Sequence, residues 1–206
     1  KSGIATLTPM HLELINGNLM QGIEVVNEDT YSDEALQIAL DHNLTIMGTS
    51  DVHGLIDFDF APEHGGHRPV TLVFAKDRTE AALKEALFAG RTAVWYKNML
   101  IGKEENLMPL VNASLKITPG AYPENREVLN ILIENSSDTE FILKNTSGFS
   151  LHQDADVFTI PAQGSKTIQV KTLKKLNSFE LTFELMNAII APDTHPVWSL
   201  KVRPAQ

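Results

Sequence analysis

The pattern of the chain changes at residues 118–120, and this change constrains the fold more than any other feature of the sequence. Before this point, segments with helical periodicity alternate with short apolar runs. After it, almost every segment reads as a short strand. Strand–helix alternation is typical of an α/β domain, and a series of short strands is typical of an antiparallel sandwich. We therefore predict two domains, at residues 1–118 and 119–206.

The first domain is expected to contain four strands that alternate with helices, except for a long polar loop from Ser50 to Arg68 between the second and third strands. The strands are predicted at Gly22–Asn27, Leu44–Thr49, Val70–Ala75 and Arg91–Tyr96. The helices are predicted at Pro9–Asn16, at Asp33–Asn43, from a Thr79 cap to about Ala89, and at Lys103–Ser114 with an interruption at Pro109. Near-continuous apolar strands favour a parallel sheet buried on both faces, whose ligands bind at the carboxyl ends of the strands.

The second domain is expected to contain only strands. They are predicted at Val128–Glu134, Thr139–Lys144, Val157–Ile160, Lys166–Thr172, Ser178–Leu185 and Trp198–Val202. Several of them alternate apolar and polar residues, which gives one face for a core and one for solvent. We expect an antiparallel β-sandwich.

Composition narrows the chemistry. The chain has no cysteine, so any metal ion must be bound by histidine, aspartate or glutamate. The net charge is −9 and no basic patch is visible, which disfavours a nucleic-acid partner. No apolar run approaches the roughly 20 residues that span a membrane. The chain starts at Lys1 without a signal-peptide pattern, so we expect a processed or truncated piece, and its cellular location is not determined.

The segment Gly48–Gly54 holds the strongest candidate for a functional site. Asp51 and His53 follow an apolar strand and are two residues apart. In extended backbone, such residues point to the same side, so a carboxylate and an imidazole would converge on one cation. Four further polar residues in the following loop are expected to be solvated rather than functional: Asp57, Asp59, Glu63 and His64.

Other polar residues lie near the predicted strand ends. Glu24 interrupts an apolar strand, and Asn27 ends it, so they are candidates for supporting a site, with an exposed strand edge as the equal alternative. His67 and Arg68 precede the third strand and are candidates for binding a substrate anion. Arg91 opens the fourth strand, where a surface ion pair is at least as reasonable as an anion contact.

Together, these motifs resemble the polymerase-and-histidinol-phosphatase (PHP) family of metal-dependent phosphoesterases. The resemblance rests on Gly22–Asn27, Gly48–His53, His67-Arg68 before a strand, and Ala89–Thr92. It covers about residues 1–117 and is closest to two-domain bacterial proteins in which a β-sandwich follows the PHP domain. The order and spacing of the motifs match the last portion of a PHP domain.

The resemblance implies the C-terminal portion of a distorted (β/α)7 barrel with two or three divalent ions, Zn, Mn, Fe or Mg, at the strand carboxyl ends. Asp51 and His53 would be the closing pair of metal ligands, and a metal-activated water would hydrolyse a small phosphoester. The family's early His-x-His motif is missing from these 206 residues. The N-terminal remainder of the barrel, or another chain, is therefore expected to complete the site.

Two alternatives stay open at this point. The β-sandwich could make the chain a non-catalytic module that binds a glycan or a protein. A metal-dependent amidohydrolase is a weaker alternative, because such barrels also place histidine and aspartate at strand ends.

Overall fold

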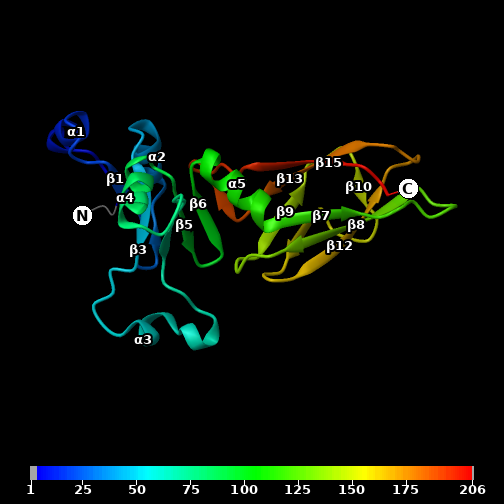
Figure 1. Ribbon diagram of the computed structural model, residues 1–206, viewed down its shortest axis with the longest axis horizontal. Helices are drawn as coiled ribbons and strands as arrows, with labels where there is room; N and C mark the ends of the chain where they lie inside the picture. Colours follow the sequence, from blue (N-terminus) through cyan, green and yellow to red (C-terminus); the bar gives the residue numbers. More distant parts are fainter. Residues whose placement is uncertain (1–3, 206) are drawn as a thin grey trace. The chain divides into compact units, whose positions relative to one another are not determined.

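The structure is a computed structural model that describes residues 4–205. The chain divides into two compact units, one that extends to Leu107 and includes Ile189–Thr194, and one formed by Met108–Ala188 and His195 onward. As predicted, an α/β region comes first in the chain and is followed by antiparallel strands that form a sandwich (Figure 1). The boundary at residues 118/119 stays a prediction.

The first unit contains two sheets. The elements before the sandwich are α1 (Pro9–Asn16), β1 (Gly22–Asn27), β2 (Thr30–Tyr31), α2 (Asp33–Asp41), β3 (Thr45–Thr49), α3 (Ile56–Phe60), a 3₁₀ turn (Pro62–His64), β4 (Val70–Val73), α4 (Glu80–Phe88), β5 (Thr92–Tyr96), β6 (Met99–Gly102) and α5 (Glu104–Ser114). One sheet has the order β2-β1-β3, and the other has the order β14-β6-β5-β4, with β14 at Ala188–Ile189.

The predicted parallel sheet is only partly correct. Strands β1 and β3 are parallel, in the register Ile23↔Ile46. Strands β4, β5 and β6 are antiparallel to one another, with pairs such as Leu72↔Ala93. Strands β5 and β6 are joined by a tight turn in which Lys97, not a glycine, has the positive φ of 51°. The sequence therefore lacks the glycine that usually indicates such a hairpin. Closure of these sheets into a barrel is not confirmed and stays a proposal.

The apolar positions of β1, α2 and β3 explain why this unit folds locally as predicted. Ser32 caps α2 by accepting a hydrogen bond from the backbone N–H of Ala35. Leu36 of α2 is fully buried with Val26 of β1 and Ile46 of β3 in one apolar core. The predicted interruption of α5 at Pro109 is wrong, because the helix continues to Ser114. Leu107 and Val111, two residues before and two residues after the proline, are both fully buried, so packing holds this part of the helix although proline cannot donate a hydrogen bond.

The second unit is a β-sandwich of two four-stranded antiparallel sheets. Their strands are β7 (Leu115–Pro119), β8 (Val128–Asn135), β9 (Phe141–Asn145), β10 (Ser150–Leu151), β11 (Val157–Ile160), β12 (Ser165–Lys171), β13 (Phe179–Leu185) and β15 (Val197–Val202). The sheet orders are β10-β12-β8-β7 and β11-β9-β13-β15. Alternate residues of β8 and β13 are buried, so each sheet turns one apolar face inward, as the period of two predicted.

Candidate functional site

A pocket of about 510 Å³ lies at the carboxyl ends of the parallel strands β1 and β3. Its lining comes from the turn after β1, from the loop after β3 and from helix α3: Glu28, Asp29, Ser50, Asp51, Val52, His53, Gly54, Asp59 and Phe60. We call it the carboxyl-edge pocket. Because parallel strands end at the same edge of a sheet, two loops distant in sequence meet there. This is the edge at which ligands were expected.

Asp51 and His53 come together in this pocket. Asp51 Oδ1 lies 3.5 Å from His53 Nε2, and both side chains are accessible to solvent. The predicted reason for their approach is wrong, however. Strand β3 ends at Thr49, and Asp51 has a φ of 43°, so the segment is not extended backbone. The side chains converge through a left-handed turn instead of through strand alternation.

The backbone leading into this turn is fixed by contacts with neighbouring strands. Thr71 of β4 accepts a hydrogen bond from the Gly48 N–H at 2.9 Å and donates one to the Gly48 carbonyl at 3.0 Å. The Glu28 N–H, at the end of β1, donates to the Thr49 carbonyl at 3.1 Å. A left-handed φ at a residue other than glycine is disfavoured, and it persists where surrounding contacts determine it. Asparagine and aspartate tolerate it best.

Glu24 and Asn27 lie next to each other beside the strand ends. Glu24 is exposed, and its carboxylate accepts hydrogen bonds from Asn27 Nδ2 at 3.1 Å and Thr49 Oγ1 at 2.6 Å. Because Glu24 is exposed, solvent and these two hydrogen bonds together accommodate its carboxylate in an otherwise apolar strand. Neither Glu24 nor Asn27 lines the carboxyl-edge pocket, so their role as supporting residues stays a prediction.

His67 and Arg68 are arranged differently from each other. The two ring nitrogens of His67 lie 2.8 Å from the Arg68 carbonyl and 2.9 Å from the Lys97 carbonyl, and the ring packs on Trp95 with centroids 3.9 Å apart. To bind a substrate, the His67 ring would have to break its hydrogen bond with the Arg68 or the Lys97 carbonyl. The Arg68 side chain is exposed and forms no ion pair with any residue between 4 and 205. Substrate binding by these residues stays a prediction.

A metal ion fits Asp51 and His53 as a pair of ligands but not as a complete site. Two ligands that are each about 2.1 Å from a tetrahedral ion lie about 3.4 Å apart, close to the separation of these two side chains. Within residues 4–205, however, no group of three or more histidine or acidic side chains is arranged to hold a metal ion. Since three or four protein ligands are usual, further donors are needed.

Sequence reasoning missed two acidic residues of the pocket. Glu28 and Asp29 directly follow β1, as Ser50 and Asp51 directly follow β3. The signal available was the pairing of adjacent parallel strands, which brings the residues after both ends together. Asp59, expected to be a solvated loop residue, also lines the pocket.

Comparison with known proteins relates the chain to a larger protein. A solved crystal structure of a two-domain protein from Bacteroides vulgatus ATCC 8482, containing a predicted PHP-like metal-dependent phosphoesterase, is similar to 98% of this chain, with 32% sequence identity and a TM-score of 0.88. The chain spans 58% of that longer chain. The match is to its C-terminal part, as the resemblance to two-domain PHP-like proteins predicted.

The sandwich has a second, independent match. Residues 115–201 match the family DUF5001, described as an Ig-like domain, so this region of the chain is Ig-like. No curated protein matches the chain. Between residues 4 and 205, no helix is long and apolar enough to cross a membrane.

Proposed function

We propose that this chain, as a relative of a two-domain protein with a predicted PHP-like metal-dependent phosphoesterase, forms part of an enzyme that hydrolyses phosphoesters. The observation that carries the proposal is the coincidence of two findings. First, 98% of this chain matches that relative, with 32% sequence identity. Second, Asp51 and His53 of this chain lie 3.5 Å apart in a pocket at the strand carboxyl ends.

In this proposal, Asp51 and His53 are two ligands of a divalent-metal centre. The remaining ligands come from a segment outside these 206 residues, either an N-terminal remainder of the barrel or another chain. The metal ions would supply Lewis acidity and lower the pKa of a bound water. This chain would orient two of the metal ligands, because the hydrogen bonds of Thr71 and Glu28 to the β3 backbone fix the start of the loop that carries them.

The charge of the carboxyl-edge pocket supports a role for cations. Four carboxylates line it, from Glu28, Asp29, Asp51 and Asp59, and no lysine or arginine among residues 4–205 does. Such a surface repels the negative charge of a phosphoester in the absence of bound cations. A phosphoesterase built on this pocket therefore needs metal ions between the protein and its substrate.

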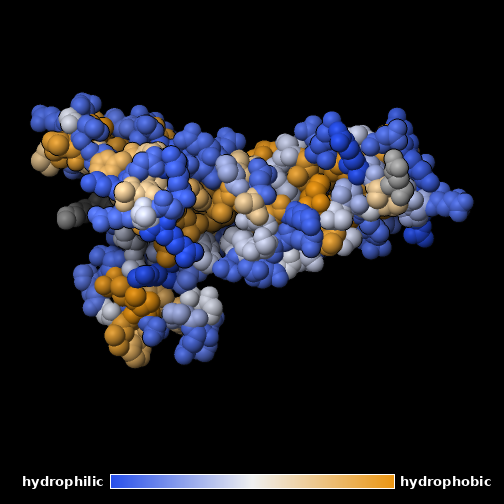
Figure 2. All heavy atoms as spheres, viewed as in Figure 1, coloured by the Kyte–Doolittle hydropathy of each residue, from blue (hydrophilic) through white to orange (hydrophobic). Residues whose placement is uncertain are grey.

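Exposed apolar side chains on the first unit support the proposal that a segment outside these 206 residues covers it. Eleven large apolar side chains are exposed among residues 4–205, and eight of them precede residue 108. These eight are Ile4, Met10, Leu12, Leu19, Leu55, Phe58, Leu83 and Phe88. Helix α1 buries none of its residues, although a helix this short depends on packing for stability. Figure 2 shows apolar side chains on the surface over α1 and α3.

We infer that the occupant of this surface is the remainder of a distorted (β/α)7 barrel, of which residues 1–118 form the C-terminal portion. The 58% coverage of the relative's chain supports this assignment, because it leaves a substantial segment of that chain unmatched. The exposed apolar residues would then be barrel contacts.

The test uses the intact protein that contains these residues. Hydrolysis of p-nitrophenyl phosphate and bis-p-nitrophenyl phosphate is measured with and without Mn²⁺ or Zn²⁺. Asp51→Asn is preferred to alanine because asparagine tolerates the left-handed backbone at this position. We expect Asp51→Asn and His53→Ala each to lower metal-dependent kcat/KM at least 100-fold and to reduce the bound metal content.

Asp57→Asn is the matched control, because Asp57 is an exposed carboxylate of the neighbouring helix α3 that does not line the pocket. It should leave kcat/KM within twofold of the unmodified protein. Full metal-dependent activity in both Asp51→Asn and His53→Ala would exclude the proposed ligand roles. Hydrolysis of p-nitroanilide amides without phosphoester hydrolysis would favour the amidohydrolase alternative instead.

A further inference from the structure

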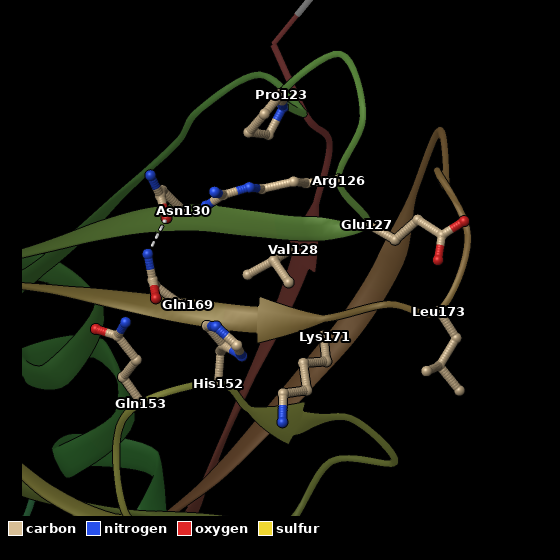
Figure 3. Close-up of a pocket in the computed structure, with 10 residues that line it drawn as sticks. All are labelled: Pro123, Arg126, Glu127, Val128, Asn130, His152, Gln153, Gln169, Lys171 and Leu173. Carbon is tan, nitrogen blue, oxygen red and sulfur yellow. Dashed lines mark hydrogen bonds between the residues drawn. The ribbon is translucent and has the colours of Figure 1, made fainter.

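A second pocket, of about 520 Å³, lies on the β-sandwich, separate from the carboxyl-edge pocket. It is formed by β8 and β12, the segment before β8 and the segments after β10 and β12 (Figure 3). We call it the sandwich pocket. Its lining residues are Pro123, Arg126, Glu127, Val128, Asn130, His152, Gln153, Gln169, Lys171 and Leu173.

Strand register explains why these side chains gather. Asn130 of β8 is paired with Gln169 of β12, and Val128 is paired with Lys171. The residues between them, such as Leu129 and Val170, are fully buried in the sandwich core. Because side chains alternate across a strand, both of these pairs face outward from the sheet. The sandwich pocket therefore lies on the solvent side of the sheet.

The lining of the sandwich pocket is positively charged, although the whole chain has a net charge of −9. Among the described residues that line it, Arg126 and Lys171 are cationic, His152 lies beside them, and Glu127 is the single carboxylate. None of these four side chains forms an ion pair with another residue in the described part of the chain. Figure 3 shows Arg126 directed along β8 toward Asn130, while Glu127 points toward the Leu173 side. An anionic group is the natural complement of this surface.

Three side-chain amides supply neutral hydrogen-bonding groups beside the cations. Gln169 Nε2 donates to Asn130 Oδ1 at 3.0 Å, which fixes both amides on the sheet surface. The Gln169 Oε1 atom is buried and accepts no hydrogen bond from any residue between 4 and 205. A buried acceptor without a partner is unfavourable, so this position favours a ligand or a rearranged side chain that donates to it. Gln153 completes the set of amides at the pocket.

The rim of the sandwich pocket is apolar. Pro123, Val128 and Leu173 line it beside the polar groups. Leu173 is 84% exposed and has a φ of 59°, a disfavoured combination for a leucine, with no burial to compensate for it. The lining matches the chemistry of a sugar acid. Its amides can bind hydroxyl groups, its cations can bind a carboxylate, and its apolar side chains can pack against the C–H faces of a sugar ring. The volume lies within the roughly 300–1,000 Å³ that is usual for small-molecule sites.

We propose that the sandwich pocket binds an acidic saccharide, with Arg126 and Lys171 at the carboxylate and the amides of Asn130, Gln153 and Gln169 at the hydroxyl groups. This inference is independent of the proposed phosphoesterase function, since the two pockets share no residue. The β-sandwich would hold the protein on a uronate-containing polymer whether or not the other unit is catalytic.

Isothermal titration calorimetry on the 206-residue chain at low salt tests this proposal. The probes are trimers of galacturonate, glucuronate and mannuronate, their neutral counterparts of galactose, glucose and mannose, and inorganic phosphate. At least one uronate trimer should bind at least tenfold more tightly than its neutral counterpart. Arg126→Ala and Lys171→Ala should each weaken that binding at least fivefold, and added salt should weaken it in the unmodified chain.

Lys201→Ala and Arg78→Ala are the matched controls. They remove the same charges from exposed positions that do not line the sandwich pocket, and should leave the affinity unchanged. Circular dichroism melting curves verify that each variant folds. Three results would each overturn the proposal: no binding by any uronate trimer, binding of every uronate trimer no tighter than that of its neutral counterpart, or binding of phosphate alone.

Discussion

Thr49 Oγ1 donates a 2.6 Å hydrogen bond to Glu24 Oε1, which joins the parallel strands β1 and β3 beside the carboxyl-edge pocket. The same carboxylate accepts from Asn27 Nδ2. Three polar residues from two strands therefore form one small network at the edge where Asp51 and His53 meet. The bond lies at an exposed position, so its contribution to stability is modest.

Thr49→Val is predicted to lower the free energy of unfolding by about 1 kcal/mol, because valine keeps the strand shape and removes the donor. Urea denaturation of the 206-residue chain, followed by circular dichroism, measures the change. Thr49→Ser retains the hydroxyl and should lose less than Thr49→Val. Equal stability of the valine variant and the unmodified chain would show that the Glu24 contact contributes nothing.

Gly48→Ala is predicted to be destabilising because the added methyl group has no space. A Cβ at Gly48 would lie 2.5 Å from Val94 Cγ1, and Val94 is fully buried in β5. Overpacking of this kind costs roughly 1–3 kcal/mol. The free energy of unfolding from urea denaturation gives the cost.

Val94→Ala provides the matched background for this test. Removing the Val94 methyl groups opens the space that the Gly48→Ala methyl would need. Gly48→Ala should therefore cost less in the Val94→Ala background than in the unmodified chain. An equal cost in both backgrounds would mean that the destabilisation has a different origin, such as the backbone at Gly48.

The sequence predicts elements well where periodicity is long. Strand β8 extends over eight residues and β13 over seven, and both alternate buried and exposed positions, so a period of two is readable. Strands of two residues, such as β2 and β10, carry no periodicity and were not predicted. Strand β6 was missed because its hairpin turns at Lys97 rather than at a glycine.

Strand direction and the pocket lining depend on tertiary structure and are less readable. Helix α4 connects β4 to β5, an order typical of a parallel pair, yet the two strands are antiparallel. Glu28 and Asp29 enter the carboxyl-edge pocket only because β1 lies next to β3. Asp51 and His53 were predictable as a pair, although the turn that unites them was not. The spacing of Asp51 and His53 is local in sequence, whereas strand direction and the other pocket residues depend on how the strands pair.

The pH dependence of stability should reveal the ion pair between Glu85 and Arg91. Arg91 Nη1 donates to Glu85 Oε1 at 2.9 Å, and Nη2 contacts Oε2. Hydrogen bonding to Arg91 lowers the pKa of the Glu85 carboxyl below its usual 4.5. A lowered pKa in the folded state means that the stabilisation is present above the unfolded-state pKa and is lost as the pH falls through the folded-state value.

Glu85→Gln should therefore lower the melting temperature at pH 7, and the difference from the unmodified chain should shrink below about pH 4.5 and then disappear. Calorimetry between pH 3 and pH 8 measures it. Glu13→Gln, at an exposed carboxylate of α1, is the matched control and should show no such trend. A difference that is constant across this pH range would contradict a role for the charge on Glu85.

The final prediction concerns the most deeply buried tryptophan, Trp198 of β15. Its indole N–H donates to Asn112 Oδ1 of α5 at 3.0 Å, and the side chain is only 2% exposed. Asn112→Ala should lower the free energy of unfolding by about 1–3 kcal/mol, because it leaves a buried donor without a partner. In a Trp198→Phe background, which lacks the donor, the same substitution should cost much less. Guanidinium denaturation of the four proteins, followed by circular dichroism, completes this double-mutant cycle. Equal costs of Asn112→Ala in both backgrounds would show that Asn112 stabilises α5 by some other contact.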